Sequence, residues 1–226
     1  MPVLPGPGAL LFDLDGTLVD TVGTRIRAWM EALGQVALPT ARDQIADLIG
    51  LDGRQLAREV AAAAGRDLSD AEAEALDREA GEIYGRLNSD PTPLPGLKPL
   101  LRALERQRIP WAIATSSRRE QVAASVAALG FATPPRIVDG THVTMAKPDP
   151  ELLLLGARDL GVRPEVCWYV GDSTWDMRAA VAAGMVGVAV TAGSAVDHTA
   201  LAGAGATVSV GTLDEIAQLV RDGIAS

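Results

Sequence analysis

The chain of 226 residues contains one cysteine, Cys167, so no disulfide can form within it. Cys167 lies in an apolar run, and we expect a buried structural thiol there. No stretch approaches the roughly 20 consecutive apolar residues that a membrane-spanning helix needs. The first residues, MPVLPGPGALL, hold three prolines and no charged side chain, which does not fit a signal peptide. We therefore expect a soluble cytoplasmic protein.

Positive charge is also scarce. The 29 Asp and Glu residues outnumber the 20 Lys and Arg residues, and the formal net charge is −9. A chain with this balance lacks the basic surface that nucleic acids require, so we expect neither a nucleic acid nor a membrane as partner. An acidic protein that acts on an anion needs a local source of positive charge. A divalent cation held by carboxylates would supply it.

Lysine and histidine each occur only twice. Lys147 precedes Pro148 near the expected start of a helix, whereas Lys98 has no such context. Because the chain otherwise uses arginine, the lysine at position 147 indicates that a compact point charge is needed there. We expect Lys98 to be a solvated surface residue, and we assign no role to His142 or His198.

Apolar residues make up 48% of the chain, which is enough for a sizeable core and too many for a disordered protein. Beyond residue 96, short apolar runs alternate with segments of helical periodicity. This alternation predicts parallel βαβ units in a doubly wound α/β sheet. The predicted strands cover residues 9–12, 111–114, 136–138, 166–170, 186–190 and 206–210, and the predicted helices residues 97–107, 119–129, 150–160, 176–183 and 213–221.

The segment between residues 21 and 90 has no β-rich run. Its helical periodicity begins after Thr21, and further helices are predicted at residues 41–49, 54–64 and 69–87. The run PTPLPG at residues 91–96 then predicts a stiff linker. A chain of this length suits one domain with an insertion, or two small domains. We predict an α/β core of residues 1–20 and 91–226, interrupted after its first strand by a helical insertion of residues 21–90.

The run FDLDGTLVDT, residues 12–21, is the most informative motif. Asp13 and Asp15 follow a short apolar strand, and Gly16 ends it. Catalytic side chains are displayed at the carboxyl end of a strand in such a sheet. One carboxylate there could attack an electrophile while its neighbour moves a proton. An Asp-x-Asp pair alone is equally well explained as a turn with a capping aspartate, so the remaining chain must supply the partners of a site.

Three later strand ends supply such partners. Thr115 and Ser116 follow one strand and lead into a helix, where hydroxyls and free backbone N–H groups bind phosphate. For Ser117, an ordinary helix cap is at least as good an explanation. Asp172 follows another strand and is placed to bind a hard cation. Asp176, four residues on, could hold a metal-bound water or simply favour the start of a helix.

In this order and position, the run at residues 12–21, Thr115–Ser117, Lys147 and the Asp172–Asp176 pair resemble motifs I to IV of the haloacid dehalogenase (HAD) superfamily of phosphatases and phosphotransferases. The resemblance covers nearly all of the predicted core and implies a Rossmann-like fold. The helical insertion resembles a C1-type cap, which closes over substrate. Within the superfamily, the chain is similar to phosphoglycolate phosphatases and β-phosphoglucomutases.

The resemblance implies a Mg²⁺-dependent phosphatase that hydrolyses a small phosphorylated metabolite, a sugar phosphate or a phospho-acid such as phosphoglycolate, through an aspartyl-phosphate. Asp13 would be the nucleophile, and Asp15 the general acid and base, a role that contributes about 10²–10⁴-fold. Lys147 would pair with the nucleophile and the phosphate. The implied phosphate-binding residues are Thr115, Ser116 and Gly16, and the implied metal-binding residues are Asp13, Asp15, Asp172 and Asp176.

Related reactions can be weighed against the residues. Haloacid dehalogenases use no metal and lack the second aspartate of the first motif, which is present here as Asp15. Phosphonatases form a Schiff base with a cap lysine, and residues 21–90 contain no lysine. β-Phosphoglucomutases carry a cap histidine where this chain has Arg25. A mutase is therefore a less favoured alternative, and a non-catalytic binding module is the least favoured.

The cap would read the leaving group. Arg25, Arg54 and the loop at residues 50–53 are the candidate contacts, and the two arginines could meet a second anionic group. A solvated arginine on a helix face explains Arg54 equally well. Trp175 could pack under the cap or in the core. The sequence leaves both a monomer and a homodimer open.

Overall fold

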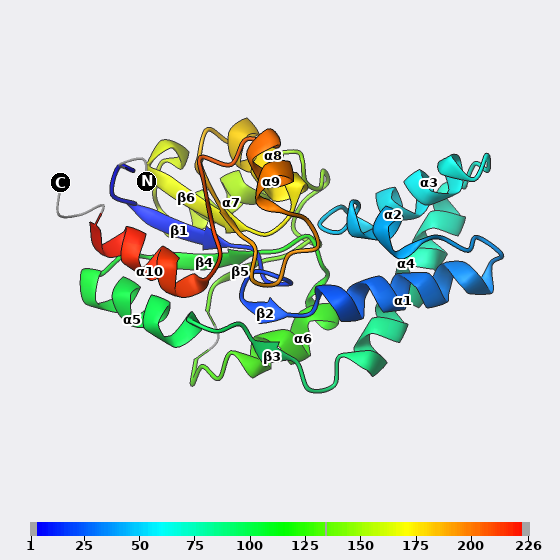
Figure 1. Ribbon diagram of the computed structural model, residues 1–226, viewed down its shortest axis with the longest axis horizontal. Coiled ribbons are helices and arrows are strands. Elements are labelled where there is room, and N and C mark those ends of the chain that lie inside the picture. The colour runs from blue at the N-terminus through cyan, green and yellow to red at the C-terminus, as the bar shows by residue number, and fades with distance from the viewer. Residues whose placement is uncertain (1–3, 134, 223–226) are drawn as a thin grey trace.

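A six-stranded sheet forms the centre of the molecule in the computed structural model, which describes residues 4–133 and 135–222 (Figure 1). Its strands are β1 (Ala9–Phe12), β4 (Trp111–Ala114), β5 (Ile137–Val138), β6 (Cys167–Gly171), β7 (Val186–Val190) and β8 (Val208–Val210). They lie in the order β5-β4-β1-β6-β7-β8, and each pairs in parallel with its neighbours. The chain thus builds outward on both sides of β1, as a doubly wound sheet does.

Helices cover both faces of this sheet. Successive side chains of a strand point to opposite faces, so Leu10 and Phe12 of β1 join one apolar cluster while Ala9 and Leu11 join another. On the first face the cluster contains residues of α5 (Leu97–Gln107), α6 (Arg119–Ala128) and α10 (Leu213–Asp222), and on the second face residues of α7 (Glu151–Leu160) and α8 (Thr174–Ala182).

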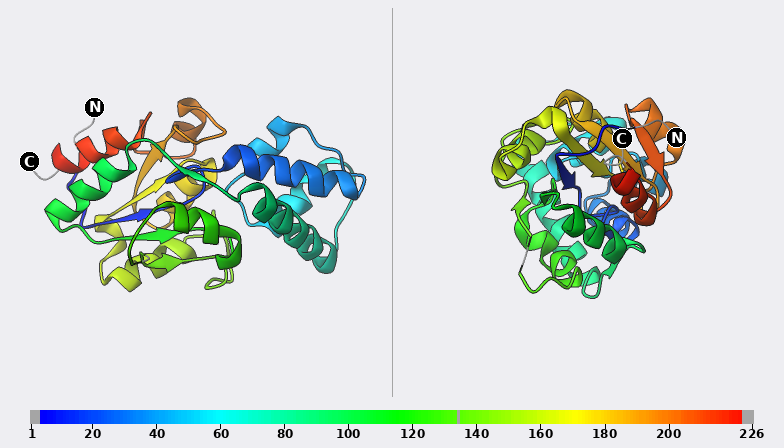
Figure 2. Two further views of the ribbon diagram at one scale, coloured as in Figure 1. Left: turned by 90° about the horizontal axis from the view of Figure 1, so that it is seen from below. Right: turned by 90° about the vertical axis from the view of Figure 1, so that its left-hand side faces the viewer.

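Four helices form a second body beyond the carboxyl ends of the strands (Figures 1 and 2). They are α1 (Val22–Gln35), α2 (Arg42–Ala46), α3 (Gly53–Ala63) and α4 (Asp70–Leu87). Their apolar faces pack into a cluster of their own, which contains Ile26, Trp29 and Ile83. The Rossmann-like core with a helical cap, as predicted from the sequence, is therefore confirmed.

Several short elements were not predicted. Strands β2 (Val19–Asp20) and β3 (Thr92–Pro93) pair antiparallel where the chain enters and leaves the four-helix body. Each has two residues, which is too short for a period-2 pattern, and β3 lies in the proline-rich run expected to be only a linker. Helix α9 (His198–Gly203) and a 3₁₀ turn (Pro164–Val166) have three to six residues each and were missed for the same reason.

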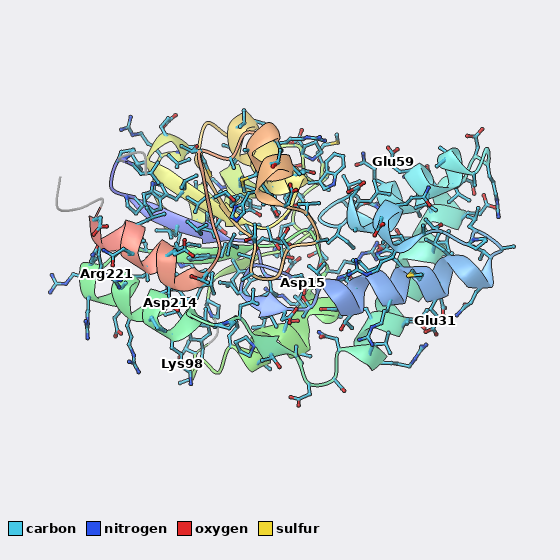
Figure 3. The ribbon with its side chains drawn as sticks, in the orientation of Figure 1. Asp15, Glu31, Glu59, Lys98, Asp214 and Arg221 are labelled. Carbon is cyan, nitrogen blue, oxygen red and sulfur yellow. The ribbon has the colours of Figure 1, made fainter. Side chains whose placement is uncertain are left out.

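Two single-residue expectations are also met. Cys167 is fully buried in β6, and burial raises the pKa of its thiol to about 11. Lys98 lies exposed on the outer side of α5 (Figure 3). No helix within residues 4–133 and 135–222 is long and apolar enough to cross a membrane. The start of the N-terminal stretch examined for a signal, residues 1–3, lies outside the described residues.

Candidate active site

Asp13 and Asp15 follow β1 directly, and Figure 3 shows Asp15 at the boundary between the sheet and α1. The backbone N–H of Asp13 extends the β1–β6 ladder by donating to the carbonyl of Val170 at 2.8 Å. Gly16 then turns the chain with a φ of +80°, where a side chain would be strained. A Cβ at this position would lie 2.3 Å from Oδ2 of Asp172. The glycine therefore lets Asp172 approach β1, and its predicted contact with phosphate stays a prediction.

Three buried carboxylates gather at this edge of the sheet. Asp13 from β1, Asp172 after β6 and Asp176 on α8 each offer an oxygen within 4.8 Å of the others. All three are at most 6% exposed. The side chain of Ser173 caps α8 by accepting from the N–H of Asp176 at 3.2 Å, so the helix begins earlier than predicted and Asp176 lies in its first turn.

Lys147 is the cation of this cluster. Its ammonium group donates to Oδ1 of Asp13 at 2.7 Å and to Oδ1 of Asp176 at 2.6 Å. A third contact, 3.2 Å long, reaches the hydroxyl of Tyr169 on β6, which itself donates to Asp176 at 2.9 Å. Sequence reasoning missed Tyr169, although a tyrosine amid a buried apolar strand often carries a polar contact. These contacts fix Lys147 between Asp13, the candidate nucleophile, and Asp176 on α8.

The cluster carries more negative than positive charge. Burial raises the pKa of Asp13 to about 7, and Asp176 adds to this effect while Lys147 opposes it. Burial, with the charges of Asp176 and Asp13, also raises the pKa of Asp172 well above its ordinary range. Three ionised carboxylates around one ammonium group carry excess negative charge, which a further cation bound by carboxylate oxygens would offset. The donor set therefore fits a hard divalent ion.

The two oxygens of Asp176 are already in use. Oδ1 accepts from Lys147 and Tyr169, and Oδ2 accepts from the N–H and hydroxyl of Ser173 at 2.9 and 2.6 Å. Asp172, by contrast, accepts one bond, at 3.1 Å from the hydroxyl of Thr17, among the contacts of the described residues. The geometry thus gives Asp176 the task of orienting Lys147, and it leaves Asp13 and Asp172 as the better placed metal ligands.

The loop after β4 forms the opposite wall. Thr115 is buried, and its hydroxyl accepts from the N–H of Ser117 at 3.2 Å. Ser116 reaches across to the helical body and donates to the carbonyl of Gly50 at 3.4 Å. Ser117 donates to Oδ2 of Asp15 at 3.2 Å, a contact beyond the capping role considered from the sequence. These three residues line the same cavity as Asp13 and Lys147.

Asp15 points away from the carboxylate cluster. It forms an ion pair with Arg25 and accepts from the hydroxyls of Thr21 at 2.7 Å and Tyr84 at 2.9 Å. Burial alone would raise the pKa of Asp15, but the charge of Arg25 and these hydrogen bonds hold it below its ordinary value. Because both oxygens are engaged, the geometry does not favour the predicted metal-binding role for its side chain.

Comparison with known proteins shows the family of the chain. A model of the haloacid dehalogenase-like hydrolase family matches residues 10–190. The chain belongs to this family. It is 33% identical over 188 residues to an N-acetylmuramic acid 6-phosphate phosphatase of Pseudomonas aeruginosa, with 82% of each chain covered. It is also 34% identical over 183 residues to a fructose-1-phosphate phosphatase of Escherichia coli, with 80% of this chain and 95% of the relative covered.

A solved hydrolase from Pseudomonas syringae has the same fold. It superimposes with a TM-score of 0.88 at 32% identity, and the match covers 93% of this chain and 96% of that one. The family resemblance inferred from the sequence is therefore confirmed.

In this haloacid dehalogenase-like hydrolase, a cavity of about 290 Å³ lies between the core and the four-helix body. Asp13, Asp15 and Lys147 line its core side, whereas Trp29 and Arg54 line the side of the helices. This volume is at the small end of the range for ligand sites, which suits a small metabolite.

The two arginines predicted to contact the substrate, Arg25 and Arg54, both line the cavity, and each is paired with a carboxylate of the protein. Arg25 bonds to Asp15, and its guanidinium carbon lies 3.7 Å from the ring centroid of Tyr84. Arg54 makes two 3.0 Å bonds to Asp52, the residue that caps α3. The guanidinium groups thus meet carboxylates of the protein itself.

Sequence reasoning missed a third arginine of the wall. Arg118, at the start of α6, bonds to both carboxylate oxygens of Glu74 at 2.8 and 3.0 Å and lies 3.3 Å from Asp77. Arg118 belongs to the core, whereas Glu74 and Asp77 belong to α4, so nothing near it in the sequence signals the contact. Trp175, left open above, packs against the helical cluster and donates to the carbonyl of Asp47 at 3.0 Å.

Proposed function

We propose that this hydrolase is a Mg²⁺-dependent phosphatase that acts on a small phosphomonoester with Asp13 as its nucleophile. The observation that carries the proposal is the buried pair of Asp13 and Lys147 beside a second buried carboxylate, Asp172. The relative named for fructose 1-phosphate supports a phosphorylated sugar as substrate.

Asp13 and Asp172 would hold the cation. Mg²⁺ binds through few protein carboxylates, which agrees with this pair. When bound, the ion would supply positive charge that keeps Asp13 ionised at neutral pH and offsets the charge of the phosphate.

In the first step, a carboxylate oxygen of Asp13 bonds to phosphorus while the bond from phosphorus to the leaving oxygen breaks. Lys147 holds Asp13 in orientation and presents its charge to the phosphate. Thr115 and Ser116 lie where their hydroxyls can donate to the phosphate oxygens. Asp15 gives a proton to the leaving oxygen, so the products are an alcohol and an aspartyl-phosphate.

In the second step, Asp15 takes a proton from the attacking water, and the water oxygen bonds to phosphorus. The bond to Asp13 breaks, which releases inorganic phosphate and restores the carboxylate. The lowered pKa of Asp15 in this arrangement keeps the carboxylate ionised and able to accept a proton, but it also makes it a weaker base. Before the first step, Asp15 must gain a proton, and this requires Arg25 to loosen its hold.

The helices of residues 21–90 then act as a cap whose position affects proton transfer, because Arg25 and Tyr84 reach Asp15 from α1 and α4. The mutase alternative gains no support from Arg25, which is occupied by Asp15 in the place where the mutases carry a histidine. The binding-module alternative leaves the assembly of Asp13, Lys147 and Asp172 unexplained.

The test is release of inorganic phosphate from a panel of phosphomonoesters, with Mg²⁺ and with a chelator. We expect release that needs Mg²⁺ and that falls to background in Asp13→Asn, while circular dichroism shows an unchanged fold. Equal release by the variant, or release that a chelator does not affect, would contradict the proposal.

A further inference from the structure

The part of the cavity away from the carboxylate cluster has an unusual charge arrangement. Of the residues that the structure describes, three arginines line the cavity: Arg25, Arg54 and Arg118. Each of them is bound to at least one carboxylate of the protein. Positive charge is therefore present but already neutralised.

We infer that the substrate's leaving group is uncharged and rich in hydroxyl groups, and that Asp52 and Asp77 select against substrates carrying a second anionic group. The inference rests on the proposed phosphatase activity and specifies its substrate class.

The pairing geometry argues against an anionic leaving group. Arg54 uses Nε and Nη2, one of the two faces of its guanidinium group, on Asp52. Arg118 gives Nη2 to both oxygens of Glu74, and Asp77 lies 3.3 Å from the same nitrogen. A substrate carboxylate that bound the remaining N–H groups would still lie close to the protein carboxylates that already neutralise each arginine.

Asp77 strengthens this argument. It lines the cavity, is only 8% exposed and lies 3.3 Å from Arg118. A buried carboxylate repels a second anion strongly because little water screens the two charges. Gly53 is fitted against it, since a Cβ there would lie 1.9 Å from Oδ1 of Asp77. The carboxylate is thus held in place by the start of α3.

The same groups suit hydroxyls. A hydroxyl donates to a carboxylate and accepts from a guanidinium N–H at once, so a polyol can bridge an ion pair without breaking it. The Asp52–Arg54 pair offers both kinds of partner, and Trp29 adds an apolar surface for C–H groups. Asp52 and Arg54 also line a wider groove beside the cavity, so this pair lies where a leaving group would extend outward.

The experiment uses pairs of phosphomonoesters that differ only in one group, CH₂OH against carboxylate. Glycerol 3-phosphate is compared with 3-phosphoglycerate, sorbitol 6-phosphate with 6-phosphogluconate, and 2-hydroxyethyl phosphate with phosphoglycolate. We expect kcat/KM to be at least about tenfold higher for the neutral member of each pair, mainly through KM. A preference for the acids, or equal rates, would overturn the inference.

Two variants sharpen the test. Asp52→Asn removes the charge paired with Arg54 yet keeps a good helix cap, and Asp77→Asn removes one of the two carboxylates paired with Arg118. Each should shift the preference toward the acid member by about tenfold. Glu31→Gln is the matched control, because Glu31 pairs with Arg86 on the outer side of the cap (Figure 3). Ratios in both Asp variants that equal the Glu31→Gln ratio would overturn the inference.

The outcomes also separate this inference from the proposed function. p-Nitrophenyl phosphate is included as a general reporter of phosphatase activity. If neither it nor any ester releases phosphate in the presence of Mg²⁺, the proposed function fails, and the inference with it. If phosphate is released and the acids are preferred, the proposed function stands and only the inference fails.

Discussion

The two walls of the cavity handle charge in opposite ways. On the core wall, Asp13, Asp172 and Asp176 surround one ammonium group, so negative charge is in excess and buried. On the opposite wall, called the cap wall here, Arg54 pairs with Asp52, and Arg118 of the core reaches Glu74 of the cap; these pairs are partly exposed. The core wall thus suits the cation and the phosphate of the proposed reaction, and the cap wall suits a neutral leaving group.

The strongest test of this contrast is Lys147→Met. Removing the ammonium group leaves Asp13 and Asp176 buried without their partner, so we expect phosphatase activity to fall to background. We also expect the free energy of unfolding to fall by about 3–5 kcal/mol. Urea denaturation at neutral pH and phosphate release measure the two effects.

The chain supplies its own control, because it has only one other lysine. Lys98→Met alters an exposed residue and should change neither quantity. A Lys147→Met variant that is as stable and active as Lys98→Met would contradict the assigned role of the buried pair.

A smaller effect is expected at the second aspartate. Asp15→Asn removes the proton donor and acceptor and should lower kcat for an alkyl phosphate by about 10²–10⁴-fold. With p-nitrophenyl phosphate, phosphorylation of Asp13 should suffer far less, since that leaving group needs no proton. The comparison requires a rapid-mixing measurement of nitrophenol release. An equal loss with both substrates would indicate that Asp15 has another role.

Without Mg²⁺, the carboxylate cluster should make the free energy of unfolding depend on pH. Burial raises the pKa of Asp13 from 3.8 to about 7, so within that window the folded state keeps a proton that the unfolded chain has lost. The stabilising contribution is complete below the unfolded pKa and is lost as the pH rises through about 7. The raised pKa of Asp172 acts in the same direction.

Urea unfolding in a chelator should therefore show a less stable protein at about pH 7 than at about pH 5, and Mg²⁺ should restore more stability at the higher pH. Asp13→Asn should flatten the dependence on pH. A protein whose stability rises between these two pH values in a chelator would contradict the excess of buried negative charge.

The smallest effect is expected on the cap wall. Arg118 and Glu74 are 33% and 41% exposed, so Glu74→Gln should change the free energy of unfolding by no more than about 1 kcal/mol. A double-mutant cycle with Arg118→Gln measures the coupling energy of the pair directly. A coupling energy as large as the roughly 3–5 kcal/mol expected for Lys147→Met would remove the distinction between the two walls.

The sequence predicted the core wall better than the cap wall, and the reason is topological. Parallel strands end at one edge, so polar residues that follow each strand, such as Asp13, Thr115 and Asp172, can be expected to meet. No comparable rule links Arg118 to Glu74 or Tyr84 to Asp15, because these contacts join the core to an inserted body. They depend on how the cap is placed, which periodicity does not encode.

Sequence spacing also did not predict which partners individual carboxylates bind. The sequence placed Asp15 and Asp176 near the metal; in the structure Asp15 pairs with Arg25 and Asp176 with Lys147, and their contact with a metal stays a prediction. Two carboxylates of the same type two or four residues apart are indistinguishable by spacing. Only the partners on other elements decide which oxygen is free.

The most direct test of the account is to trap the phosphorylated nucleophile. Asp15→Asn is incubated with Mg²⁺ and p-nitrophenyl phosphate, quenched in acid and digested for mass spectrometry. The account predicts one added phosphoryl group on the peptide that contains Asp13, and none in the double variant with Asp13→Asn. A phosphoryl group on another residue, or none at all while the wild-type protein turns over the same substrate, would contradict it.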